Sequence, residues 1–277
     1  MEKENDFTRF IYEAKKNAPA LIPNRRQVDA FTDNLMELLF NQDCIKNEFF
    51  LGSCMQYIKK QLHELIARCC NGSEIVAGKF TDDFLDKLIP VYGLLLKDAA
   101  SIEASDPAAN SVAEVIISYP GFYAIGVHRL AHELYLLNIP FLPRLMSEYA
   151  HSRTGIDIHP GATIGNPFAI DHGTGIVIGQ TAIIGSNVKI YQGVTLGALS
   201  VKKSNVSIKR HPTIEDHVIL YAGCTILGGD TVVGHHSVIG GNVWLTSSVE
   251  PYSIVYNTNE IKIQNKSFND DPINFII

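Results

Sequence analysis

One histidine lies in a segment whose composition is otherwise typical of buried strands. The segment AIDHGTGIVIG runs from Ala169 to Gly179, and it places His172 between an aspartate and a glycine. Imidazole exchanges a proton near neutral pH, which makes it a common proton acceptor in catalysis. Such chemistry requires a ring outside the apolar core, so the surrounding pattern decides whether His172 can perform it.

A second polar group follows a long break in the apolar pattern. The segment GALSVKKSNVSIKRHP spans residues 197–212, and it places Arg210 directly before His211. A guanidinium is suited to bind a carboxylate, because its planar N–H groups match the two carboxylate oxygens. These two side chains are the second candidate for chemistry.

The elements that would position both groups repeat every six residues. No helix has this period, and a lone amphipathic strand has a period of two, whereas three short strands that form a triangular coil have a period of six. We therefore predict a hexapeptide β-helix of roughly five coils, with the repeated residues in its core. These residues are Ile158, Ile164, Ile170, Ile178, Ile184, Ile190, Leu196, Ile214, Leu220, Ile226, Val232, Val238 and Trp244.

The repeat is interrupted at both polar groups. The spacing from Ile170 to Ile178 is eight residues, which predicts a bulge that carries His172 on the surface of the prism. The eighteen residues after Leu196 could fill a coil or form an outward loop. We favour the loop, because Lys202 would point inward in a coil. Since a single prism cannot easily enclose a substrate, we expect a symmetric trimer in which the bulge of one prism faces the loop of the next.

Composition restricts the class of protein. The 277 residues are 46% hydrophobic, which indicates a folded chain of one large or two ordinary domains. A net charge of −6 gives no reason to expect nucleic acid as a partner. No apolar run reaches membrane-spanning length, and MEKENDFTRF is unlike a signal peptide. Five cysteines without a CxxC motif predict reduced thiols in a cytoplasmic protein.

The first half of the chain has a helical pattern. AFTDNLMELLF and MQYIKKQLHELIARCC repeat apolar residues at helical spacing, and VAEVIISYPGFYAIGVHRLAHELYLL predicts two helices broken near Pro120 and Gly121. We therefore predict an α+β chain with three parts: an all-α domain over residues 1–150, a parallel β-helix over residues 151–255, and a tail over residues 256–277.

The sequence resembles the serine O-acetyltransferases of bacteria and plants. The matching stretches lie within roughly residues 105–250 and are SDPAA, YPGFYAIGVHRLAHEL, GIDIHPGATIG, DHGTGIVIG, YQGVTLGA and KRHPTIEDHVILYAGCTILGG. The resemblance implies a left-handed β-helix after a helical domain. It also implies transfer of acetyl from acetyl-CoA, the co-substrate, to the hydroxyl of L-serine in cysteine biosynthesis, with no metal.

The resemblance also assigns roles to individual residues. His172 matches the catalytic base, and Asp157, fifteen residues earlier, matches the carboxylate that orients it. Arg210 matches the residue that binds the carboxylate of serine, and Asp106 and Asp171 match those that bind its ammonium group.

His211 matches a second histidine that contacts the substrate and helps to stabilise the transition state. Small residues match positions along the pantetheine arm of acetyl-CoA, where they let it approach the backbone: Gly197, Ala198, Ala222 and Gly240.

The chain also departs from the family pattern. Gln180 stands where members often have Glu, Ile208 and Lys209 stand where many have Gly-Asp, and VYNTNEI replaces the usual GVPAR. The departure near the C-terminus concerns the contacts to CoA more than the chemistry.

Other functions stay open at this point. The chain could be a hexapeptide acetyltransferase for a sugar or an antibiotic, a scaffold whose tail regulates another enzyme, or a purely structural solenoid. A zinc enzyme like the γ-class carbonic anhydrases would need three converging histidines and would leave Arg210, Asp106 and Asp171 without a role. Its candidate ligands are His159, His211, His217, His235 and His236.

The resemblance further implies three kinds of partner. The chain is expected to form a homotrimer or a dimer of trimers. Its C-terminal Ile277 implies binding to O-acetylserine sulfhydrylase. L-cysteine is expected as a feedback inhibitor at the serine site, because it differs from serine by one atom.

Overall fold

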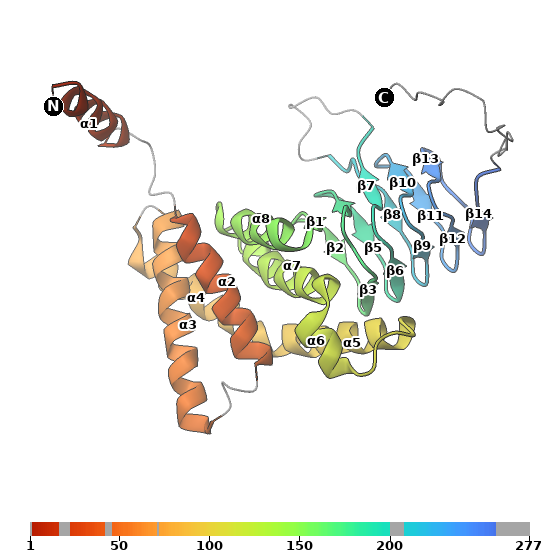
Figure 1. Ribbon diagram of the computed structural model, residues 1–277, viewed down its shortest axis with the longest axis horizontal. Helices are drawn as coiled ribbons and strands as arrows, with labels where there is room; N and C mark the ends of the chain where they lie inside the picture. Colours follow the sequence, from red (N-terminus) through yellow and green to blue (C-terminus); the bar gives the residue numbers. More distant parts are fainter. Residues whose placement is uncertain (1, 17–22, 42–45, 71, 200–207, 259–277) are drawn as a thin grey trace, which may run out of the picture.

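The computed structural model describes residues 2–16, 23–41, 46–70, 72–199 and 208–258 (Figure 1). The helical elements occupy the first part of the chain, as predicted. They are α1 (Glu2–Lys16), α2 (Arg25–Phe40), α3 (Glu48–Cys69), α4 (Glu74–Leu85), α5 (Leu88–Ser105), α6 (Val112–Ser118), α7 (Pro120–Leu136) and α8 (Leu142–Thr154). None of these described helices combines the length and the apolar composition that a membrane span requires.

Local sequence explains where several helices begin. Asn24, Asn47, Ser73 and Ser111 each cap a helix, because their side-chain oxygens accept a backbone N–H of the first turn. Pro120 is the first residue of α7 and separates it from α6. The predicted break at this proline is confirmed.

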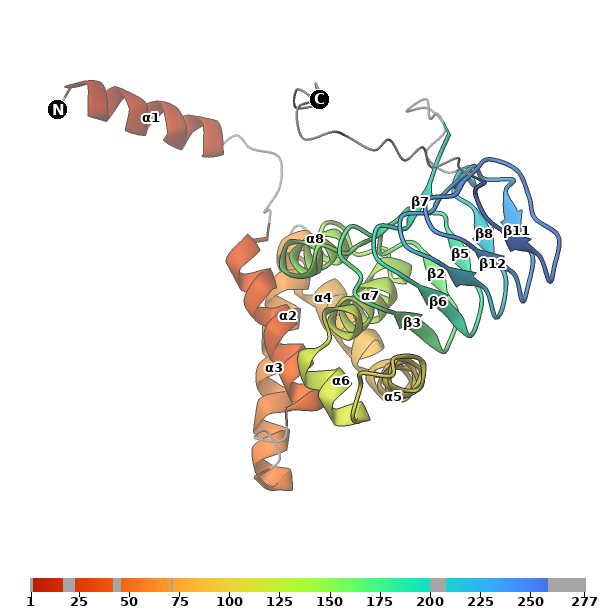
Figure 2. The same ribbon diagram turned by 45° about the vertical axis from the view of Figure 1, so that its right-hand side comes forward.

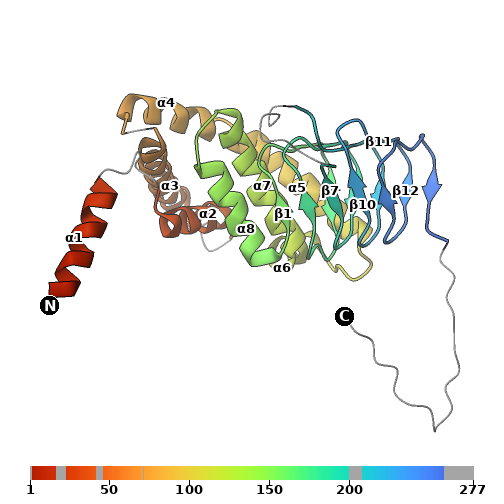
Figure 3. The same cartoon turned by 90° about the horizontal axis from the view of Figure 1, so that it is seen from above.

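The remainder of the described chain forms a β-helix of short parallel strands. The strands are β1 (Asp157–Ile158), β2 (Thr163–Ile164), β3 (Phe168–Ile170), β4 (Val177–Ile178), β5 (Ile183–Ile184), β6 (Val188–Ile190), β7 (Thr195–Gly197), β8 (Thr213–Ile214), β9 (Ile219–Leu220), β10 (Thr225–Leu227), β11 (Val232–Val233), β12 (Val238–Ile239), β13 (Trp244–Leu245) and β14 (Ile254–Val255). The first sheet has the order β1-β4-β7-β10-β13, the second β11-β8-β5-β2, and the third β14-β12-β9-β6-β3. The coils are stacked away from the helices (Figure 3). The predicted β-helix is confirmed.

The chain passes between these sheets at edges, two of which carry the predicted site residues. We call the passage from the third sheet to the first the His172 edge; it consists of residues 171–176, 191–194, 221–224 and 240–243. We call the passage from the first sheet to the second the Arg210 edge; it consists of residues 159–162, 179–182, 198–199 with 208–212, and 228–231.

The interior of the β-helix contains most of the repeated aliphatic residues. Ile164 is half-buried and packs against this core. Nine others are at most 3% exposed: Ile158, Ile170, Ile178, Ile184, Ile190, Leu196, Ile214, Leu220 and Ile226.

The prediction is wrong for the last three positions of the repeat. Val233 and Ile239 are completely buried, whereas Val232 and Val238 are half-buried and Trp244 is 68% exposed. The inward-facing position has therefore moved by one residue.

One additional residue at the end of β10 explains this shift. The inward-facing residues Ile226 and Val233 are seven positions apart. The extra residue is Leu227, by which β10 continues beyond Ile226, since the turn 228–231 has four residues like the turns 159–162 and 179–182. Trp244 consequently pairs with Thr225, whose side chain faces outward from β10. Because side chains alternate between the two faces of a strand, a shift of one residue reverses which of them point inward.

Both predicted interruptions are confirmed. The strand β8 pairs directly with β5, and β9 pairs with β6, so the segment between β7 and β8 does not contribute a coil. Lys202, on which that prediction depended, lies outside the described residues. At the other interruption, the side chain of His172 is 72% exposed.

The helices α5 and α7 pack against the first coil (Figure 2), and a buried ion pair joins the two helices there. Asp98 of α5 and Arg129 of α7 are 0% and 7% exposed, and Nε of Arg129 lies 2.5 Å from Oδ2 of Asp98. The carboxylate also accepts the backbone N–H of Phe168 and the amide of Asn166, each at 2.8 Å. A buried pair is stable only when such additional partners satisfy it. The network holds α5 against β3, and Asp106 follows the last residue of α5.

Candidate active site

The bulge that carries His172 has a strained backbone. His172 has a φ of +58°, which residues with a Cβ adopt only rarely. The next residue, Gly173, has a φ of +90°, and a Cβ there would lie 2.5 Å from Cδ1 of Ile156. The glycine is therefore required both by conformation and by space. The bulge turns the imidazole outward and leaves Asp171 beneath it, with Oδ1 of Asp171 3.7 Å from Nδ1 of His172.

Lys189 connects this bulge to the helical part of the protein. Its Nζ lies 3.1 Å from Oδ2 of Asp171 and donates to the backbone oxygen of Ser105 at 2.8 Å. Ser105 is the last residue of α5, so this contact places the following Asp106 beside the bulge. Sequence reasoning missed Lys189. The available signal was that Lys189 lies one coil beyond Ala169, with which it pairs in register.

Asp106 is an ionised carboxylate in this position. Its Oδ2 accepts the hydroxyl of Tyr119 at 2.7 Å, and its Oδ1 accepts the N–H of Ala108 at 2.9 Å. These hydrogen bonds, with smaller contributions from the charges of Lys189 and His172, hold the pKa of Asp106 below its usual value. The hydrogen bond to Asp106 also raises the pKa of Tyr119 to about 12. Asp106, Asp171 and His172 thus form one group. Tyr119, like Lys189, contacts this group and was not predicted from the sequence.

Asp157 lies in a different environment. It is on β1 and faces α8, where its Oδ1 is 3.8 Å from Nη1 of Arg144. Among the described residues, the carboxylate within ion-pair distance of His172 is that of Asp171. The pairing of Asp157 with His172 therefore stays a prediction.

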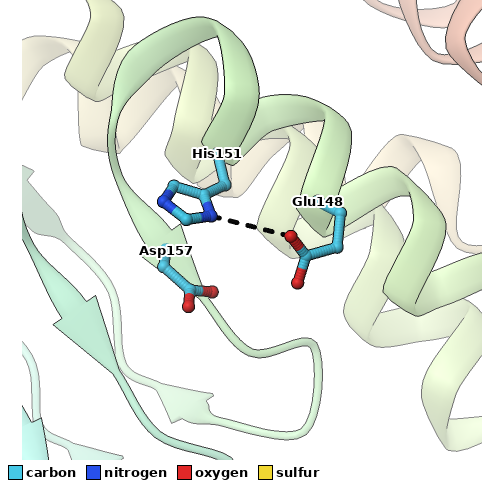
Figure 4. Close-up of side chains that lie close together, drawn as sticks. All are labelled: Glu148, His151 and Asp157. Atoms are coloured by element: carbon cyan, nitrogen blue, oxygen red, sulfur yellow. Dashed lines mark ion pairs between the residues drawn. The ribbon is translucent and has the colours of Figure 1, made fainter.

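A cluster around Asp157 has the composition of a metal site. One ligand atom each from Glu148, His151 and Asp157 lies within 4.8 Å of the others, and His151 Nδ1 is 3.6 Å from Glu148 Oε2 (Figure 4). Arg144, however, forms ion pairs with both Glu148 and Asp157. Its guanidinium supplies the positive charge between the two carboxylates, so we assign no metal to this cluster.

On the Arg210 edge, Thr181 positions both predicted residues. Its Oγ1 accepts the backbone N–H groups of Arg210 at 2.9 Å and His211 at 3.1 Å. Its own backbone N–H donates to Nδ1 of His211 at 3.1 Å. The Arg210 side chain donates from Nη2 to Oε1 of Gln180 at 2.6 Å. The pair Gln180–Thr181 therefore holds the pair Arg210–His211.

His211 is a neutral imidazole with a defined tautomer. Burial, followed by the charges of Arg210 and Lys209, lowers the pKa of His211 to about 4. Because Nδ1 accepts a backbone N–H, the ring proton is on Nε2, which makes His211 a hydrogen-bond donor at that atom. Burial and nearby charges, first that of Arg144 and then that of Arg210, likewise lower the pKa of His159 to about 4.

The structure does not bring all predicted residues together within one chain. Asp106, Asp171 and His172 meet at the His172 edge, whereas Arg210 and His211 lie on the Arg210 edge. The small residues divide in the same way: Ala222 and Gly240 are on the His172 edge, while Gly197 ends β7 and Ala198 begins the Arg210 edge. Each edge thus carries half of the predicted site.

Comparisons with known proteins identify the family. A Synechococcus elongatus protein named serine acetyltransferase, plasmid, is 52% identical over 184 residues, covering 65% of this chain and 57% of that protein. The serine acetyltransferase of Bacillus subtilis is 46% identical over 164 residues, covering 59% of this chain and 73% of that protein. The chain belongs to the serine acetyltransferase family. This confirms the prediction from the sequence. The matched segment spans little more than half the length of the cyanobacterial relative, and no family model matches the chain.

Solved structures agree over most of the chain. Serine acetyltransferase isoform 3 of Entamoeba histolytica, in complex with cysteine, has a TM-score of 0.77 and 31% identity, covering 94% of each chain. The Neisseria gonorrhoeae enzyme in complex with serine has a TM-score of 0.59 and 25% identity, covering 87% of this chain and 97% of that chain. A serine acetyltransferase in complex with CoA has a TM-score of 0.57 and 26% identity, covering 83% and 94%. The predicted architecture of a helical part and a β-helix is thereby confirmed.

Proposed function

We propose that this chain transfers the acetyl group of acetyl-CoA to the hydroxyl of L-serine and so forms O-acetylserine for cysteine biosynthesis. The observation that carries the proposal is the group of Asp106, Asp171 and His172, in which two carboxylates lie beside an exposed imidazole. Carboxylates in this position suit the ammonium group of an amino acid. A sugar would use the imidazole but would leave both carboxylates without a partner.

We propose that the site is completed between neighbouring chains of a homotrimer. The Arg210 edge of one chain would face the His172 edge of the next, so that Arg210 binds the carboxylate of serine while Asp106 and Asp171 bind its ammonium group. This arrangement assigns a role to both halves of the divided site. The helical domain (residues 1–150) is then free to join two trimers, with the β-helix domain (residues 151–255) forming each trimer.

In the proposed reaction, His172 removes the hydroxyl proton of serine while the oxygen attacks the thioester carbonyl carbon. Asp157 is proposed to orient the imidazole. The resulting oxyanion needs hydrogen-bond donors, a role that suits Nε2 of His211. When the intermediate collapses, the C–S bond breaks and the CoA thiolate takes the proton from His172. Imidazole supplies the base, so the reaction requires no metal.

The small residues suit a groove for acetyl-CoA. Gly197 and Ala198 belong to the strand end and the turn beside Arg210, and Ala222 and Gly240 belong to turns of the His172 edge. We propose that the pantetheine arm lies between these two edges, where small side chains leave the backbone accessible.

We also propose that L-cysteine is a feedback inhibitor. Cysteine carries the same ammonium and carboxylate groups as serine, so Asp106, Asp171, Arg210 and His211 would bind both. The test is the rate of acetyl transfer to serine with added cysteine. An unchanged rate at millimolar cysteine would contradict the proposal.

The C-terminal Ile277 lies outside the described residues. We propose that it binds O-acetylserine sulfhydrylase through its apolar side chain and its terminal carboxylate. Deleting Ile277 is expected to abolish that binding and to leave acetyl transfer unchanged, whereas full affinity of the truncated chain would refute the role.

We propose a cytoplasmic location as well. Cys54, Cys69, Cys70 and Cys224 are free thiols, and such thiols persist in a reducing compartment.

The experiment that tests the function is a substrate panel with acetyl-CoA and detection of the released thiol. We expect release with L-serine and background release with sugars, aminoglycoside antibiotics and D-serine. Release with a sugar alone would replace the serine assignment by the sugar acetyltransferase. Background release with every acceptor would favour a scaffold.

A further inference from the structure

We propose that Gln180 is a positioning residue that orients Arg210 toward the carboxylate of serine without placing a negative charge beside it. The inference rests on the proposed function, because it concerns how that substrate is recognised. It assigns a role to a residue at which the chain departs from its family.

The orientation of the Gln180 amide follows from its neighbours. A guanidinium has only donors, so the amide oxygen must face Arg210, whose Nη2 donates to it at 2.6 Å. The amide nitrogen then faces Tyr135 and donates to its hydroxyl at 3.0 Å. If the amide were rotated by 180°, its NH2 group would face Arg210, and two hydrogen-bond donors would be in contact.

Tyr135 ties this contact to the helical part of the protein. It lies on α7, so the chain of contacts runs from α7 through Gln180 to Arg210. A Cβ at Gly161 would lie 2.9 Å from Cζ of Tyr135 and 3.1 Å from Cγ of Gln180. The absence of a side chain at Gly161 therefore makes room for both partners.

The charge of the partner matters as much as its position. A carboxylate at position 180 would offer Arg210 the same kind of ligand as the substrate does, and at 2.6 Å it would compete for the guanidinium. The amide accepts one N–H of Arg210 and adds no negative charge at position 180. The charge of Arg210 also acts on the nearby His211, whose pKa is lowered by burial and by that charge.

The test compares two acceptors in two variants. L-serinamide retains the ammonium and hydroxyl groups of serine but carries no carboxylate, so the ratio of kcat/KM for serine to that for serinamide reports on the contact with Arg210. In Gln180→Glu, which is nearly isosteric, we expect this ratio to fall about tenfold, with KM for acetyl-CoA unchanged. Tyr135→Phe keeps the ring but loses the hydroxyl, and we expect a fall of about threefold.

The outcomes separate this inference from the proposed function. A Gln180→Glu ratio within twofold of the wild type, or an equal loss for both acceptors, would overturn the role of Gln180 while the wild type still acetylates serine. Absence of serine acetylation by the wild type would instead refute the proposed function. Circular dichroism and thermal unfolding verify that each variant is folded, and Tyr135→Phe provides an independent test if Gln180→Glu is not.

Discussion

The two edges of the β-helix differ in charge, and in the proposed function each edge binds a different charged group of the substrate. The His172 edge brings together the carboxylates of Asp106 and Asp171 and an exposed imidazole. The Arg210 edge presents a guanidinium beside a neutral imidazole, that of His211. A zwitterion carries both charges, so the proposed substrate would contact both edges. Within one chain, the two halves of the proposed site lie on different edges.

The two edges also differ in how their conformation is maintained. At the His172 edge, Lys189 joins the end of α5 to the bulge, and Tyr119 holds Asp106, the residue that follows α5. At the Arg210 edge, the neighbouring turn holds the site residues through Gln180 and Thr181. Contacts between distant segments position the first half, and contacts between successive coils position the second.

The largest effect is expected from removing the base. His172→Ala should lower kcat by about a thousandfold, because general base catalysis typically contributes 10²–10⁴-fold. The fold should be unchanged, since the side chain is 72% exposed and lies on a bulge. Turnover near that of the wild type would exclude His172 as the base, and the base would then have to lie outside the His172 edge.

A mixing experiment tests whether the halves belong to different chains. His172→Ala and Arg210→Ala chains are each expected to be nearly inactive alone. Trimers refolded from equal amounts of both should recover about a quarter of the wild-type activity, because one site in four combines two intact edges. Mixtures of either variant with itself are the control. No recovery in hetero-trimers, verified by differently tagged chains, would show that each site is formed within one chain.

The extra residue after Ile226 predicts a difference in stability between two neighbours on β12. Ile239→Ala should cost about 2–5 kcal/mol of unfolding free energy, because the side chain is fully buried. Val238→Ala should cost less, about 1 kcal/mol, because Val238 is half-buried. Denaturant unfolding measures both. The opposite order would restore the strict six-residue repeat and contradict the shift after Ile226.

The smallest expected effect concerns pH at the His172 edge. Tyr119 lowers the pKa of Asp106, so Tyr119→Phe should return it toward the usual value of 3.8. A carboxylate attracts an ammonium group only above its pKa, so the proposed role of Asp106 requires the ionised form. Serine binding should therefore weaken as the pH falls toward 3.8 in the variant, and only at lower pH in the wild type. Isothermal titration calorimetry measures the Kd for serine as a function of pH. Identical pH profiles of the variant and the wild type would contradict a role of Tyr119 in serine binding.

Much of the fold was predictable because the β-helix is a local repeat. A period of six in Ile158–Leu196 and Ile214–Ile226 places each aliphatic residue inward. The eight-residue spacing around His172 and the polar segment after Leu196 interrupt that period, so both excursions were visible. The extra residue Leu227 was missed, because the following pairs Val232–Val233 and Val238–Ile239 are apolar at both positions and satisfy either register.

The partners of the site residues were less predictable. Lys189 reaches Asp171 and Ser105 from another coil, and Tyr119, which follows α6, reaches Asp106, which follows α5. Neither contact follows from spacing in the sequence, because the first depends on where α5 ends relative to the first two coils and the second on how α6 folds back along α5. Gln180 was visible only as a departure from the family, and its partners became clear from the structure.

The sequence by itself determined that the second half of the chain winds into a prism and that two segments leave it, because a six-residue repeat and its interruptions involve only residues that are close in the sequence. Only the tertiary structure decided that the two segments lie on different edges, which side chains hold them, and where the register shifts. The physical reason is that those outcomes depend on contacts between coils and between helix and coil, whose geometry arises when the whole chain has packed.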